Sequence, residues 1–154
     1  MNLFYVPFVL QAGLMLVDEF YCHQRRELPL WERVGHPLDT LSMLICIGMC
    51  VLLAPTASNL QWYLIAAVIS SLLITKDEFI HKTVCTSLEH WLHSLLFVIH
   101  PTCLIAAGYL WSEHGHDTFF RFQSYLTLAF LSYQVLAGAV FARNTFGTNQ
   151  QRNI

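Results

Sequence analysis

Apolar residues dominate five stretches of the chain, and short polar segments separate them. The stretches cover residues 3–23, 37–54, 59–81, 89–112 and 120–142. Each approaches the ~20 residues that an α-helix needs to cross the hydrocarbon core of a bilayer. The pattern predicts an all-α integral membrane protein with about five transmembrane helices, folded as a single domain over residues 1–154.

The composition supports a location in the lipid bilayer. The chain is 55% hydrophobic and 12% charged, and its mean hydropathy is +0.48. Ordinary soluble domains carry about 25% charged residues, so these charges are too few to cover a water-facing surface. The formal net charge is -2 and the sequence has no basic patch, which argues against nucleic acid as a partner.

The distribution of basic residues predicts an orientation. In a five-helix topology only Arg121 lies on one side of the membrane, and the other seven basic residues lie on the opposite side. Because positive residues concentrate in cytoplasmic segments, we expect the N-terminus outside and the C-terminus in the cytoplasm.

Two polar motifs occur twice. The motif Asp-Glu-Phe at 18–20 recurs at 77–79, and a histidine follows each copy. The motif Glu-x-x-x-His at 32–36 recurs at 89–93. The spacing between copies is nearly constant, which indicates an internal duplication.

The duplication predicts two tandem helical hairpins. Repeat A covers about 3–54 and repeat B about 59–112, while the helix at 120–142 stands outside the duplication. Both hairpins start outside and turn inside, so they are parallel repeats related by an axis along the membrane normal. Four helix ends, each with a carboxylate and an imidazole, are expected to meet at the cytoplasmic end of a four-helix core.

These helix ends carry the candidate chemistry. Ionisable groups at membrane depth are costly and usually mark function. Acid and histidine lie three or four residues apart, so most pairs share a helix face. Carboxylates and imidazoles are the ligands that bind iron or manganese pairs. The predicted metal ligands are Glu19, His23, Glu32, His36, Glu78, His81, Glu89 and His93. The residues expected to support them are Asp39, Asp77, His90 and His100.

The ligand set resembles that of di-iron helical bundles, in which acids and Glu-x-x-His pairs project inward from four helices. Residues 78–81 match Glu-x-x-His literally, whereas the Glu-x-x-x-His pairs depart from that pattern. The resemblance implies two divalent metal ions as cofactors, with iron preferred and manganese or zinc as alternatives. The predicted function is a membrane-embedded di-metal oxidoreductase that acts on a lipophilic substrate.

Simpler interpretations apply to single residues. One Glu–His pair at a helix end is usually a hydrated interfacial pair. Asp18 and Glu27 are expected to be bystanders, because Asp18 points about 100° away from Glu19 on a helix. The His100 ring precedes Pro101, so it either donates to a carbonyl freed by the proline or lines a path from the site into the membrane.

Other functions remain open from the sequence. The same residues could serve a non-catalytic divalent metal carrier, a b-type haem electron carrier, a zinc hydrolase or a purely structural layer of ion pairs. The nearly apolar outer halves of the helices argue against transport, and the four carboxylates argue against haem. The small residues around Gly138 allow either packing onto the core or formation of a homodimer. The scattered cysteines are expected to be packing residues.

Overall fold

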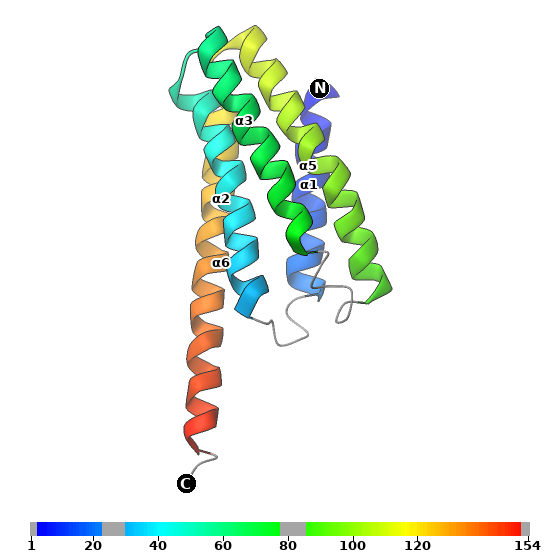
Figure 1. The fold of residues 1–154 in the computed structure, drawn as a ribbon, viewed down its shortest axis with the longest axis vertical. Helices are drawn as coiled ribbons and strands as arrows, with labels where there is room; N and C mark the ends of the chain where they lie inside the picture. The colour runs from blue at the N-terminus through cyan, green and yellow to red at the C-terminus, as the bar shows by residue number, and fades with distance from the viewer. Residues whose placement is uncertain (1–2, 23–29, 78–85, 152–154) are drawn as a thin grey trace.

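The computed structural model of the chain describes residues 3–22, 30–77 and 86–151, and this part is a bundle of α-helices without strands (Figure 1). Two short 3-10 helices and one π-helix extend the α-helices. The elements are η1 (Leu3–Tyr5), α1 (Val6–Val17), the π-helix η2 (Asp18–Cys22), α2 (Leu30–Leu52), α3 (Ala57–Leu73), η4 (Ile74–Asp77), α5 (Ser87–His114) and α6 (Thr118–Gln151).

Four of the helical segments are long and apolar enough to cross a membrane. Within the described residues these spans are Leu3–Tyr21, Arg33–Leu52, Ala57–Lys76 and Ser87–His114. Large apolar side chains cover their outer faces, as in Leu64, Val98 and Ile105. The prediction of an all-helical protein is therefore confirmed for the described residues, and four helices have the length and apolar composition expected of spans.

Helix α6 is the longest helix of the described chain, and the four spans found among the described residues do not include it. Part of its length is polar on the side that faces the bundle. Gln123, Thr127 and Gln134 line an internal cavity described below. The opposite face of the helix carries exposed apolar residues such as Leu128 and Leu136.

The helices run up and down, so four helix ends gather at one end of the bundle. Figure 1 shows the end of α1, the start of α2, the end of α3 and the start of α5 at the end toward which α6 carries the C-terminus. The N-terminus and the α2–α3 and α5–α6 connections lie at the opposite end. This is the arrangement of helix ends that the duplicated motifs predict.

The packing partners differ from the predicted four-helix core. Helix α6 packs along α2, α1 packs on α5, and α3 packs on both α2 and α5. Gly138 of α6 sits against the backbone of Arg33, because a Cβ built on this glycine would lie 3.8 Å from the Arg33 carbonyl oxygen. The fifth helix is thus part of the bundle, and its small residue serves packing within the chain.

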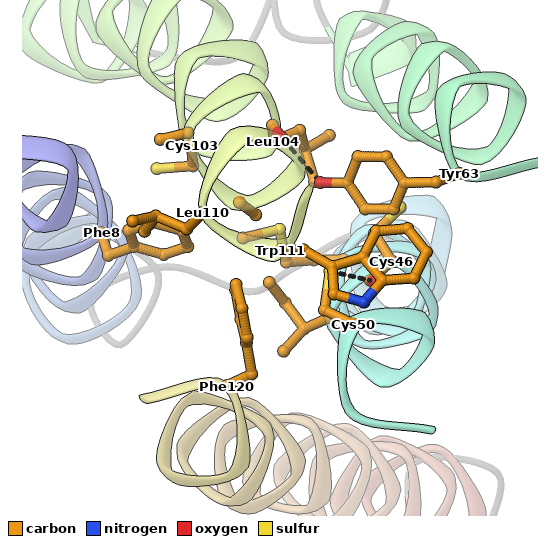
Figure 2. Close-up of a cluster of buried hydrophobic side chains, with 13 residues drawn as sticks. Phe8, Cys46, Cys50, Tyr63, Cys103, Leu104, Leu110, Trp111 and Phe120 are labelled. Carbon is orange, nitrogen blue, oxygen red and sulfur yellow. Dashed lines mark hydrogen bonds between the residues drawn. The ribbon is translucent and has the colours of Figure 1, made fainter. Parts of the chain in front are cut away.

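The end of the bundle near the N-terminus has a solid apolar core (Figure 2). Tyr63 of α3 donates its hydroxyl proton to the Leu104 carbonyl at 2.6 Å. A Cβ at Gly108 would lie 2.9 Å from the Tyr63 ring, so only glycine lets α5 approach α3 here. The largest fully buried side chains of this core are Cys46, Ile47, Cys50, Tyr63, Cys103, Leu104, Leu110, Trp111 and Phe120. The cysteines among them are free thiols, in line with the packing role that the sequence predicts.

Candidate functional site

A cavity of about 300 Å³ lies among α1, α2, α5 and α6, with Ile74 of η4 contributing to its wall. Its lining is mixed. The apolar lining residues are Phe8, Ala12, Met15, Leu16, Met43, Ile74, Leu96, Phe97, Leu126 and Phe130. The polar lining residues are Gln11, Asp18, Glu19, His36, Asp39, Thr40, His93, His100, Gln123, Thr127 and Gln134.

Five of the ionisable residues that the sequence singles out line this one cavity. Glu19, His36 and His93 were predicted as metal ligands, and Asp39 and His100 as their supporting residues. They come from η2, α2 and α5, so the fold brings distant parts of the sequence together. The cavity therefore brings five of the predicted site residues together, and metal binding by them stays a prediction.

The remaining predicted residues do not line the cavity or lie outside the described residues. Glu89 is buried and His90 half-buried, and neither contributes to the cavity wall. His23, Glu27, Glu78 and His81 lie outside the described residues. Glu32 and Asp77 lie in described helices, but their side chains are not described. Among the side chains that the structure describes, no group of three or more His, Cys, Asp or Glu could hold a metal ion.

Asp18 differs from its predicted role as a bystander. Its Oδ1 lies 3.3 Å from Nε2 of His93, and both side chains are buried. Asp18 continues the inward stripe of Phe8, Gln11 and Met15, whose spacing of three, four and three residues is that of one helix face. This stripe is visible in the sequence, and it identifies Asp18 as an inward residue.

Glu89 holds the start of α5 in place. Its Oε2 accepts a hydrogen bond from the Thr86 backbone N–H at 3.2 Å, and the Glu89 N–H donates to Thr86 Oγ1 at 3.4 Å. This reciprocal pair is a capping box, which satisfies backbone donors that a helix leaves open at its N-terminus. A predicted metal ligand thus has a structural function in the described chain.

Asp39 is bound by a lysine from another helix. Lys76 Nζ lies 2.6 and 2.7 Å from the two carboxylate oxygens of Asp39, and both side chains are largely buried. The ion pair joins α2 to the end of the third span and places a positive charge beside the cavity. One further bond across the cavity wall runs from Thr40 Oγ1 to Gln134 Oε1 at 2.7 Å, linking α2 to α6.

A chain of neutral side chains crosses four helices at the level of His100. Nδ1 of His100 lies 2.9 Å from Gln11 Nε2, and Nε2 of His100 lies 2.9 Å from Ser70 Oγ. Ser70 Oγ lies 2.7 Å from Ser42 Oγ, and Ser42 donates to the Asp39 carbonyl at 2.7 Å. The ring thus bonds side chains of α1 and α3.

The sequence interpretation did not identify Gln11, Ser42, Ser70, Thr40 or Gln134 as functional residues. The available signal was a polar residue isolated within an apolar stretch, as Gln11 is between Leu10 and Ala12. In a membrane segment such a residue usually finds a partner on a neighbouring helix.

Comparisons with protein-family models, with curated proteins and with solved structures find no match for this chain. Function is therefore argued from the cavity and its side chains.

Proposed function

We propose that this protein binds a lipophilic small molecule inside the membrane, in the cavity among α1, α2, α5 and α6. The observation that carries the proposal is the cavity itself, with apolar walls and a small set of converging polar groups. Sites for small molecules have this character, and their volumes begin at about 300 Å³. Apolar walls suit the body of a lipophile, and the polar groups would orient its head.

The contacts that α1 and η2 make with α6 support access from the bilayer. Phe8 packs on Phe119 with ring centroids 4.9 Å apart, and Phe20 packs on Tyr133 at 5.5 Å. Between these two contacts, cavity-lining residues reach the outer surface, as Leu16 is 48% and Leu126 49% exposed. The interval between the two aromatic contacts would admit an apolar molecule directly from lipid.

Filling the cavity tests the proposal. We expect 4-hexylphenol to bind the wild-type protein saturably in nanodiscs, measured by titration calorimetry with empty nanodiscs as the blank. Leu96→Trp should weaken binding roughly ten-fold or more, because the larger ring occupies the cavity that Leu96 lines.

Val98→Trp is the matched control on the same helix, because Val98 is 63% exposed on the outer face of α5. It should leave the affinity unchanged. Absence of saturable binding to the wild-type protein, or equal affinity in both tryptophan variants, would contradict a ligand site in this cavity.

Metal-dependent oxidation of the bound lipophile is the second candidate function. The observation that favours it is the gathering of Glu19, His36 and His93 around one cavity, joined by Asp18. These are the ligand types that iron and manganese accept. The proposed cofactors are two divalent metal ions, with iron preferred and manganese or zinc as alternatives.

Elemental analysis of purified protein tests the metal proposal. We expect about two metal ions per chain, as in other two-metal sites. Glu19→Gln should abolish metal binding, because Glu19 lines the cavity together with His36 and His93. Glu113→Gln, an exposed position near the C-terminal end of α5, should retain the metal. Wild-type protein without stoichiometric metal would end the proposal, and so would full metal content in Glu19→Gln.

Metal transport is disfavoured by the packing at the opposite end of the bundle. The cavity is followed there by fully buried apolar side chains, including Ile47, Leu104 and Phe120. A carrier needs a polar route to both faces of the membrane, and the described residues of this core offer none.

The basic residues also support a proposed orientation, with the N-terminus outside and the C-terminus in the cytoplasm. Arg33 and Lys76 lie at the end of the bundle that holds the cavity's acids, whereas Arg121 lies at the other end. Positive residues favour the cytoplasmic side. Protease accessibility of a C-terminal tag in sealed vesicles would distinguish the two orientations.

A further inference from the structure

We infer that the cavity selects lipophiles whose head carries a hydrogen-bond donor, and that Gln11 Oε1 is the acceptor that recognises it. The inference rests on the proposed ligand-binding function and adds the chemical class of the ligand. Its basis is the hydrogen-bonded chain through His100, in which each proton can be assigned to one bond.

The assignment starts at Ser42. The Asp39 carbonyl only accepts, so the single hydroxyl proton of Ser42 is used there. Ser42 Oγ can then only accept from Ser70, which commits the Ser70 proton. Ser70 Oγ in turn must accept from His100 Nε2. The ring therefore carries its proton on Nε2.

The tautomer of His100 determines how Gln11 is oriented. A neutral ring with its proton on Nε2 has a bare Nδ1, which needs a donor. Both ring contacts are to neutral side chains, and a charged imidazole at this depth would require an acidic partner. Gln11 must therefore present its amide nitrogen to Nδ1, at 2.9 Å, and this fixes the position of its oxygen.

The amide of Gln11 is thus satisfied on one side only. Its nitrogen also reaches Met15 Sδ at 3.8 Å, so both amide protons have an acceptor. Its Oε1 is buried and has no hydrogen-bond partner among the residues that the structure describes; the residue is 6% exposed and lines the cavity. A buried carbonyl without a donor is unfavourable, and a bound molecule can supply the missing bond.

The chemistry of Oε1 defines the ligand class. A carbonyl oxygen accepts hydrogen bonds and never donates them, so it favours binding of a hydroxyl or N–H head group. An ether, an ester or a quinone carbonyl offers no proton and gains nothing at this position. Phenols, long-chain alcohols and other lipophiles with a hydroxyl head fit both the apolar walls and Gln11.

Two isomeric probes separate this requirement from hydrophobicity. 4-Hexylphenol and 4-pentylanisole have the same formula, but only the phenol can donate a hydrogen bond. In nanodiscs we expect the wild-type protein to bind the phenol roughly ten-fold more tightly than the anisole, as one added hydrogen bond predicts. The preference is measured after subtracting the partition of each probe into empty nanodiscs.

Gln11→Leu should remove the preference while retaining binding of the anisole. Gln123→Leu is the matched control, because Gln123 lines the same cavity from α6 and is not in the His100 chain. It should retain the ten-fold preference, so a loss in both variants would contradict the assignment to Gln11.

The outcomes separate this inference from the function on which it rests. Equal affinity of the wild-type protein for the two isomers would overturn the inference, with water as the donor to Oε1, and would leave the ligand-binding function standing. Failure of both isomers to bind would overturn both. A Gln11→Leu protein that keeps the full preference for the phenol would also overturn the inference.

Discussion

Replacing Trp111 with alanine is expected to lower the free energy of unfolding by about 3–5 kcal/mol, the usual cost of removing a buried tryptophan. Trp111 is fully buried among α2, α3 and α6. Its ring lies 5.6 Å from that of Tyr63, and its Nε1 donates to the Leu53 carbonyl at 3.1 Å. In a bilayer the loss comes mainly from packing contacts and the residual cavity, because lipid replaces water as the medium.

Trp62→Ala provides the control for this prediction, because Trp62 is 63% exposed on the neighbouring helix α3. Equilibrium unfolding in mixed micelles, followed by circular dichroism, should show a change within about 0.5 kcal/mol for this variant. Equal destabilisation by the two substitutions would contradict the packed core at this end of the bundle.

His100→Leu is expected to lower the free energy of unfolding by about 1–3 kcal/mol. The substitution removes the hydrogen bonds to Gln11 and Ser70 and leaves Gln11 with an unused amide proton. Hydrogen bonds between membrane helices contribute about 0.6 kcal/mol on average and up to about 1.7 kcal/mol. Two such bonds, together with the orphaned donor, give the expected range.

The same unfolding assay measures His100→Leu, and His114→Leu in the last turn of α5 is its control. His114 is exposed, so its replacement should change stability by less than about 0.5 kcal/mol. A double-mutant cycle with Gln11→Leu should give a coupling energy of about 1 kcal/mol, because the two side chains share a bond. Strict additivity would contradict the contact between them.

The sequence alone predicts the helices and the end at which their polar termini gather. Long apolar stretches can only be buried or face lipid, and turn residues mark where they end. The clustering of Glu19, His36 and His93 follows from the duplicated motifs and the alternating directions of the helices. Metal binding by these residues stays a prediction.

The packing of α6 could not be predicted from the duplication. A repeat argument pairs α1 with α2 and α3 with α5, and it assigns no place to an unrepeated helix. In the structure α6 lies along α2, where Gln134 meets Thr40 and Gly138 meets Arg33. These contacts depend on where single neutral residues lie in space. A hydropathy average over a whole segment does not register such residues.

The roles of Asp18 and Glu89 show the same limitation. A spacing argument placed Asp18 away from the site, although the stripe that begins at Phe8 carries it inward. Glu89 has a carboxylate of the kind that binds metals, but Thr86, three residues earlier, makes it part of a capping box. An acidic residue near a helix end can therefore face the cavity or cap the helix, and only the local geometry shows which.

The two halves of the bundle differ in how much space they leave. Tyr63, Trp111 and Phe120 fill the half near the N-terminus, whereas the other half is hollow around Gln11 and His93. A lipophile that entered between α1 and α6 could therefore draw on one leaflet of the bilayer only. Molecules resident in the opposite leaflet would have to cross the membrane by themselves before this protein could bind them, so lipid asymmetry would control the supply of its ligand.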